Sequence, residues 1–173
     1  MDSAQTGTPR DLTLVHVVGI GDRIAKGAAH FARPGMVRRL ITSALIDSPV
    51  FIDLARDDRI AAWTLPQGVL SQIMREIAAG RPGLITRTGL HSFVDPRHGG
   101  GRQSPSAREN LVELIEIDGQ EWLRFRPFAI DVALLRGTTA DEDGNITMEQ
   151  EAIPGEMLST AQAARRSGGI VVV

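Results

Sequence analysis

The sequence contains no cysteine, a single lysine, few aromatic residues and no long hydrophobic run. The absence of cysteine excludes disulfides, thiolate catalysis and cysteine-ligated zinc, and it fits a cytoplasmic protein. No apolar run is long enough to span a bilayer, and the N-terminus has neither the basic nor the apolar region of a signal peptide. We therefore expect a cytoplasmic protein that does not act at a membrane.

Neither sign of charge predominates in the sequence, which has 19 basic and 21 acidic residues. The formal net charge is −2, so a broad basic surface for nucleic acid is not expected. Of the 19 basic residues only Lys26 is a lysine, and the arginines are scattered along the chain. Genomic base composition explains this usage more simply than an anion-binding surface does.

What is present is a chain of the size of one domain, with 173 residues of which 42% are hydrophobic. Apolar β-rich runs alternate with helical patterns, which predicts an α/β domain over 1–173 with a largely parallel sheet. One run, IDVALLRG, is apolar at successive positions and is expected to be buried on both faces. The predicted strands are 12–19, 36–45, 60–66, 83–90 and 130–137.

Three helices are predicted from amphipathic spacing and end signals. The clearest is QGVLSQIMREIAAG (67–80), which has one apolar face and a glycine, Gly80, at its C-terminal cap. Ser48 followed by Pro49 predicts the start of another helix. GEMLSTAQAARRSGG (155–169) has helical spacing and a Gly-Gly stop.

The remaining segments are assigned from turn residues and alternation. Period-two alternation around Asp118-Gly119 predicts one inserted β-hairpin within 111–128. Glycine, proline and serine predict a loop over 95–110, and 1–10 is expected to be a flexible N-terminus. The terminal GIVVV is typical of a sheet interior, so we expect a piece of a larger α/β unit whose exposed edge favours aggregation or oligomerisation.

The acidic stretch GTTADEDGNITMEQE (137–151) is first tested as a calcium loop. With Gly144 at the glycine position, the first and last ligand positions fall on Thr139 and Gln150, so both anchoring ligands are missing. A catalytic pair of Asp141 and Asp143 would lack a histidine or other group that perturbs its pKa. We interpret the stretch as a turn that follows a strand.

Other short motifs are weak. GIGDRIAKG (19–27) follows a strand, but the third glycine of a dinucleotide loop is replaced by Ile24, and no P-loop occurs. No metal site is expected, because the histidines lack metal-ligand spacing, and the incomplete phosphate motifs give no indication of a bound cofactor. We interpret every histidine as a loop or core residue. The four histidines are His16, His30, His91 and His98.

Gln67 is the most interesting polar residue. It follows Leu65-Pro66 at a strand end and opens the helix of 67–80, a place where α/β folds bind anionic ligands. A plain first-turn glutamine explains the same residue. Both interpretations stay open from the residues alone.

Several long segments in order resemble the first half of family I CoA-transferases. They are PRDLTLVH, LPQGVLSQIMREIAAGRPGLITRTGL, FVDPR, LVELIEIDGQEWL, IDVALLRGTTADEDGNITMEQEA and AQAARRSGGIVVV. The similarity extends from about residue 9 to residue 173 and is greatest to the acetate/propionate type, in which both halves are fused. The resemblance implies an open, twisted sheet flanked by helices, with the active site between the halves.

The resemblance also implies a reaction. A glutamate carboxylate attacks an acyl-CoA thioester, the released CoA thiolate attacks the resulting anhydride, and an incoming short-chain carboxylate reverses the sequence. Coenzyme A is thus a substrate rather than a cofactor. The family's glutamate belongs to a motif of the type S-E-N-G or E-x-G, and the nearest text here, RENL (108–111), lacks the glycine. The family's N-terminal GGF signature is also absent, so the chain is expected to be truncated at both ends.

No catalytic residue is therefore assigned to this chain. The resemblance implies substrate binding by Gln67, Gly68 and Gly89. His91 stands where relatives have glycine, and ITSALIDSP (41–49) replaces a glycine-rich GGHWG stretch, so the acyl specificity is open.

Three functions follow as hypotheses. The first is part of a CoA-transferase for an acyl-CoA and a short-chain carboxylate, whose glutamate lies in a second half or β-subunit within a larger oligomer. The second is a non-catalytic remnant or a subunit that depends on a partner. The third is the α-subunit of an acyl-carrier-protein-dependent decarboxylase or lyase.

Overall fold

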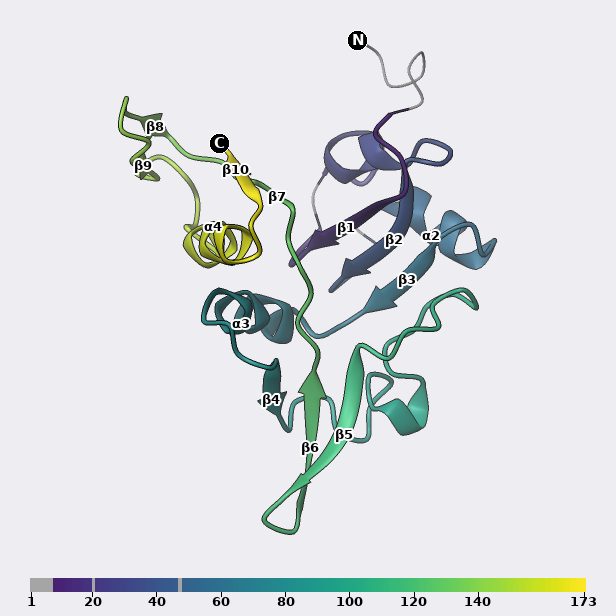
Figure 1. Ribbon diagram of the computed structural model, residues 1–173. Coiled ribbons are helices and arrows are strands. Elements are labelled where there is room, and N and C mark those ends of the chain that lie inside the picture. The colour runs from purple at the N-terminus through teal and green to yellow at the C-terminus, as the bar shows by residue number, and fades with distance from the viewer. Residues whose placement is uncertain (1–7, 20, 47) are drawn as a thin grey trace. The chain divides into compact units, whose positions relative to one another are not determined.

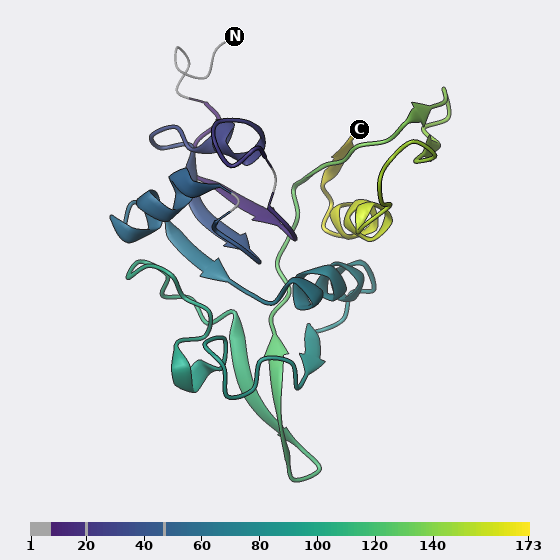
Figure 2. The same ribbon diagram turned by 180° about the vertical axis from the view of Figure 1, so that it is seen from behind.

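The computed structural model describes residues 8–19, 21–46 and 48–173 (Figure 1, Figure 2). The chain divides into two compact units, Met1–Leu70 with Ile85–Phe125, and Ser71–Leu84 with Arg126–Val173. Both units contain parallel strands and a helix, so the predicted α/β class is confirmed. Most of the predicted flexible N-terminus, 1–10, lies outside the described residues.

The first unit is built on a sheet of three parallel strands, in the order β1-β2-β3. Helical segments connect them in the chain, and the three arrows point toward the same edge of the sheet (Figure 1). The elements are β1 (Leu12–His16), 3-10 helix η1 (Gly27–Phe31), β2 (Val37–Thr42), α2 (Pro49–Arg56) and β3 (Ala61–Thr64).

Helix α2 shares a hydrophobic core with one face of this sheet. Leu40 of β2, Ala62 of β3 and Phe51 of α2 are fully buried in one cluster. The helix begins where the sequence predicts, with Ser48 as N-cap and Pro49 as the first helical residue. The Ser48 side chain makes no capping hydrogen bond, so the fixed φ of proline and the core contacts of α2 define this helix start.

A second sheet in the order β4-β6-β5 contains the predicted hairpin. Its turn has positive φ at both Asp118 (51°) and Gly119 (73°), which matches a two-residue type I′ turn. The hairpin prediction is confirmed, although the two strands cover fewer residues than the predicted range of 111–128. The elements are β4 (Leu84–Thr86), β5 (Val112–Ile117) and β6 (Gln120–Phe125).

The predicted loop of 95–110 has more structure than expected. It contains a 3-10 helix, η2 (Pro96–His98), and then runs antiparallel to β3. Thr64 N donates to Gly101 O at 2.8 Å, and Gln103 N donates to Ala62 O at 2.8 Å. Gly101 has φ +76°, and a Cβ there would lie 2.6 Å from Thr64 O, so only glycine allows this close pairing.

Helix α3 (Gln67–Ala78) confirms the amphipathic prediction. The chain leaves the helix through Gly80, whose φ is +66°. None of the helices in the described part of the chain is long and apolar enough to cross a membrane. The predicted apolar face is buried: Val69, Leu70, Ile73, Met74 and Ile77.

The second unit contains a parallel pair of strands, β7 and β10, and an antiparallel pair, β8 and β9. Helix α4 packs on one face of the β7–β10 pair. The expectation that IDVALLRG is buried on both faces is wrong for this chain, because Val132 and Leu134 are 50% and 64% exposed. The elements are β7 (Val132–Leu134), β8 (Thr139–Ala140), β9 (Ile146–Thr147), α4 (Met157–Arg166) and β10 (Ile170–Val172).

Candidate functional site

The three parallel strands of the first unit end side by side at polar residues. The register pairs His16 with Thr42 and Thr42 with Thr64, and each is the last residue of its strand. Open α/β sheets bind ligands outside the carboxyl ends of their strands. We call these three residues and the segments that follow them the carboxyl edge, and it is the candidate site.

A buried polar pair connects two strands at this edge. His16 Nδ1 lies 3.0 Å from Thr42 Oγ1 and 2.7 Å from Val18 O. Thr42 Oγ1 also accepts from Ala44 N at 3.2 Å. His16 and Thr42 are 5% and 0% exposed, so the pair fixes the starts of the loops after β1 and β2. Sequence reasoning missed the pair, because the two residues are adjacent only through the strand register.

The loop after β1 shows why the partial dinucleotide motif does not predict a phosphate site. Asp22 Oδ1 accepts the backbone N–H groups of Ile24, Ala25 and Lys26, each at 2.9 Å. These bonds, that from Lys26 first, lower the pKa of Asp22 below its ordinary value. The donors that would hold a phosphate are therefore occupied by the loop's own carboxylate.

Gln67 lies directly beyond the carboxyl edge. Leu65 and Pro66 join the end of β3 to Gln67, the first residue of α3. Leu65 is 2% exposed, and its amide donates to Thr42 O at 2.9 Å, which fixes this connection to the sheet. Gln67 itself is exposed. It lies at a strand end and a helix start, as predicted, and its role in binding stays a prediction.

The first turn of α3 provides backbone donors beside Gln67. Pro66 O accepts from Val69 N at 2.9 Å and from Leu70 N at 3.0 Å, so the amides of Gln67 and Gly68 precede the first helical hydrogen bonds. The helix dipole adds partial positive charge at this end. The arrangement can donate hydrogen bonds to a carboxylate or to the oxygen of a thioester.

The two glycines of the predicted site differ in their surroundings. A Cβ on Gly68 would meet nothing within 4 Å. Gly89 has φ +97°, and a Cβ there would collide with Val94 Cγ2. Among the described residues no hydrogen bond joins Gly89 to Gln67 or Gly68, so the backbone turn and packing explain Gly89 without a ligand.

We expect Gly89→Ala to lower the free energy of unfolding by about 2 kcal/mol, because alanine is strained at positive φ and displaces Val94. Gly68→Ala, in open space, is expected to change it by less than about 0.5 kcal/mol. Urea denaturation of both variants measures the difference. Equal losses would contradict this assignment of the two glycines.

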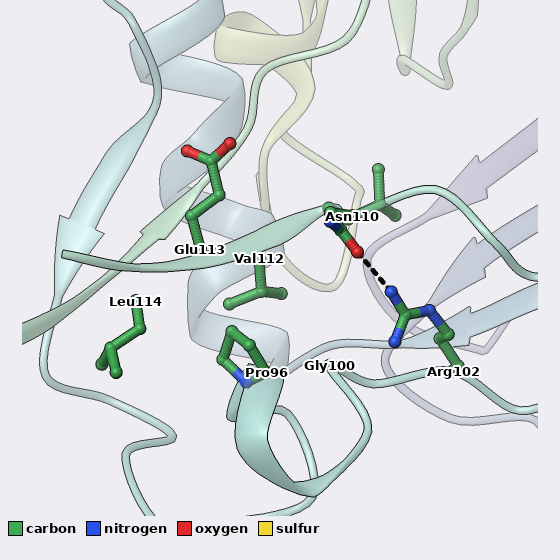
Figure 3. Close-up of a pocket in the computed structure, with 8 residues that line it drawn as sticks. Pro96, Gly100, Arg102, Asn110, Val112, Glu113 and Leu114 are labelled. Atoms are coloured by element: carbon green, nitrogen blue, oxygen red, sulfur yellow. Dashed lines mark hydrogen bonds between the residues drawn. The ribbon is translucent and has the colours of Figure 1, made fainter.

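The structure also contains a cavity of about 380 Å³ beside β5 that includes none of the predicted site residues (Figure 3). Arg102 donates to Asn110 across it and to Gly99 O at 3.1 Å. Glu113 and Val112 point to opposite faces of β5 (Figure 3). Because Arg102, the one cation among the described residues that line the cavity, is already hydrogen-bonded to Asn110 and Gly99, we do not assign the substrate to this cavity.

The most perturbed carboxyl group is structural. Asp95 is fully buried and accepts from Arg97 Nε at 3.0 Å, from Arg97 Nη2 at 2.8 Å and from His91 N at 2.9 Å. The Arg97 guanidinium holds the pKa of Asp95 well below its usual range, and Asp95 and Glu121 raise the pKa of Arg97. Since both Asp95 oxygens are occupied within the fold, this carboxylate is not available as a nucleophile.

The acidic stretch 137–151 contains the predicted turn, and the turn joins the short antiparallel strands β8 and β9, which were not predicted. Asp141 Oδ1 accepts from Asp143 N at 3.0 Å and from Asn145 N at 2.7 Å, and Gly144 has φ +82°. The Asn145 side chain is the main cause that lowers the pKa of Asp141. No group of three or more potential metal ligands occurs among the residues that the structure describes.

Comparison with known proteins identifies the family. Residues 3–168 match the family described as Coenzyme A transferase. Caffeate CoA-transferase of Acetobacterium woodii is 47% identical over 169 residues, which are 98% of this chain and 32% of that protein. The acyl-CoA transferase YdiF of Escherichia coli O157:H7, solved as a thioester complex with CoA, matches at a TM-score of 0.95 and 40% identity. That match covers 98% of this chain and 33% of YdiF.

A protein named as an enzyme subunit is also related. Acetate CoA-transferase subunit alpha of Escherichia coli K12 is 30% identical over 149 residues, which are 83% of this chain and 58% of the subunit. The parallel-sheet fold and these similarities confirm the resemblance found in the sequence. This chain belongs to the coenzyme A transferase family. It spans about a third of the length of caffeate CoA-transferase and of YdiF.

Proposed function

We propose that this chain is the first, α-like half of an enzyme that moves CoA between an acyl-CoA and a short-chain carboxylate. The observation that carries the proposal is the match to YdiF in its thioester complex with CoA, at 40% identity over 98% of the chain. The 47% identity to a caffeate CoA-transferase supports the same reaction class.

In this proposal the nucleophilic glutamate lies in a polypeptide region other than 1–173. Its carboxylate attacks the acyl-CoA carbonyl and expels CoA thiolate, and the thiolate then attacks the glutamyl carbonyl and expels the acyl carboxylate. Two carboxylates of this chain are engaged in ion pairs with arginine. Asp95 is buried against Arg97, and Glu109 of RENL lies 2.6 Å from Arg39 in an ion pair.

The part of this chain in the reaction is to bind the acyl group at the carboxyl edge. The Gln67 carboxamide and the amides of Gln67 and Gly68 donate to the carboxylate or to the acyl oxygen, where negative charge develops during transfer. The His16–Thr42 pair holds the starts of the loops after β1 and β2, the neighbouring strands of the same sheet. Coenzyme A enters as a substrate.

The partner-dependent subunit is the second candidate, and the relation to an acetate CoA-transferase alpha subunit favours it specifically. In this candidate another polypeptide supplies the glutamate, and the chain does no chemistry alone. The decarboxylase AibA/AibB shares the fold at 21% identity and a TM-score of 0.62, which does not favour decarboxylation.

The test uses a chimera in which this chain replaces the matched third of YdiF. We expect transfer of labelled acetate into acetyl-CoA by the chimera and no transfer by the isolated chain, since the chain supplies no nucleophile. Exchange by the isolated chain would contradict the assignment of the glutamate to another region. A folded chimera that exchanges no short-chain carboxylate would overturn the proposed function.

A further inference from the structure

Two apolar side chains are exposed in the loops that begin at the carboxyl edge. Val18, the second residue after β1, is 43% exposed, and Ile46, the fourth residue after β2, is 64% exposed. Neither belongs to the hydrophobic core that α2 shares with the sheet. We call Val18 and Ile46 the apolar pair.

Hydrogen bonds to Thr42 hold Val18 close to the connection that carries Gln67. His16 Nδ1 lies 2.7 Å from Val18 O and 3.0 Å from Thr42 Oγ1. Thr42 O accepts from Leu65 N at 2.9 Å, two residues before Gln67. Because β2 is the middle strand, Val18 after β1 and Leu65 after β3 follow the strands on either side of Thr42.

The loop after β2 starts from the same threonine. Thr42 Oγ1 accepts from Ala44 N at 3.2 Å, which fixes the first turn of this loop. Leu45 then packs against the hydrophobic core, whereas the next side chain, Ile46, is left exposed. Both members of the apolar pair therefore lie in segments that are anchored at the carboxyl edge.

The segments that leave the three strands begin with uncharged residues. The described residues directly after β1 and β2, 17–19 and 43–46, carry no charge, and neither do Leu65 and Pro66 after β3. The first acid after β1, Asp22, has one oxygen bound to three backbone amides of its own loop. Within these described segments, an acyl group beside Gln67 meets apolar side chains and no cation that would pair with a second carboxylate.

We propose that Val18 and Ile46 determine acyl specificity by contacting the tail of the acyl group, so that the site favours monocarboxylates with an apolar tail over acetate and over dicarboxylates. This inference rests on the proposed function, in which the donors of Gln67 and Gly68 bind the reacting carboxyl group. Each CH₂ group that the apolar pair removes from water favours binding about fourfold. A second carboxylate would lose its water without gaining a partner.

The test compares three acceptor carboxylates in the YdiF chimera, with acetyl-CoA as the donor. Butyrate has two more CH₂ groups than acetate, and we expect its kcat/KM to be about 15-fold higher. Succinate has as many carbon atoms as butyrate but a carboxylate in place of the methyl group, and its kcat/KM should be at least about 100-fold lower than that of butyrate.

Variants of the apolar pair assign this preference to this chain rather than to the YdiF part of the chimera. Val18→Thr keeps the shape of the side chain and adds a hydroxyl, and Ile46→Thr makes a similar change in the second loop. Each should lower the ratio of kcat/KM for butyrate to that for acetate about fivefold. Ile117→Thr is the control, since Ile117 is 39% exposed at the hairpin turn, and it should leave the ratio unchanged.

Urea denaturation of each variant shows whether the fold is kept, and equal midpoints are expected because both side chains are exposed. A ratio that neither Val18→Thr nor Ile46→Thr changes would overturn the inference and leave the proposed function standing. Succinate transfer as fast as butyrate transfer would do the same, as would an equal loss for acetate and butyrate in both variants. A folded chimera that exchanges none of the three carboxylates would instead overturn the proposed function, and the inference with it.

Discussion

In the YdiF chimera, Gln67→Ala is expected to lower kcat for CoA exchange about 100-fold, the usual loss when one donor to a developing oxyanion is removed. Gln67 is exposed on the first turn of α3, so its truncation removes no core contact, and stability should change by less than about 0.5 kcal/mol. Exchange kinetics and urea denaturation of the same preparations separate the two effects. A loss in kcat without a loss in stability assigns Gln67 to substrate binding.

Two further variants sharpen this test. Gln72→Ala removes the same exposed side chain from the same helix, farther from its N-terminus, and is expected to keep full activity. Gln67→Glu places a negative charge at a helix N-terminus, where it favours stability, but the charge repels a substrate carboxylate. Its activity should therefore fall while its stability is kept or raised. Wild-type kcat in Gln67→Ala would leave Gln67 as a plain first-turn glutamine.

Local sequence patterns were sufficient to predict an element when its spacing and end residues lie within the element itself. The apolar spacing of α3 and the stop at Gly80 predicted that helix closely. Asp118-Gly119 predicted the hairpin, because a type I′ turn needs positive φ at two adjacent residues. The location of Gln67 followed for the same reason, since a strand end and a helix start are both local features.

Contacts between distant segments could not be predicted in this way. The pairing of Gly101 with Thr64 could not be predicted, because the sequence around Gly101 is rich in glycine and contains only turn residues. The His16–Thr42 pair depends on strand register, which alternation alone does not fix between strands. The exposed Val132 and Leu134 show a second limit of sequence patterns. An apolar run indicates that a strand is suited to burial on both faces, but it does not show which segment buries it.

Asp95 is the residue of FVDPR whose removal should cost the fold most. We expect Asp95→Ala to lower the free energy of unfolding by about 3 kcal/mol, because the Arg97 guanidinium loses its buried partner and the amides of His91 and Arg97 lose their acceptor. Trp63 and Trp122 both lie in the first unit, so their fluorescence during urea denaturation reports on this change. Asp53→Ala, which removes an exposed ion pair with Arg56 in the same unit, should change the free energy by less than about 0.5 kcal/mol.

The pH dependence of this difference tests its cause. The pKa of Asp95 is lowered in the folded state by the Arg97 guanidinium, so ionised Asp95 stabilises the fold above its unfolded pKa of about 4. This contribution is lost as the pH falls toward the lower, folded pKa. The stability difference between the wild-type chain and Asp95→Ala should therefore be constant near neutral pH and decrease below about pH 4. A difference unchanged at acid pH would show that Asp95 stabilises through its shape and neutral hydrogen bonds rather than through its charge.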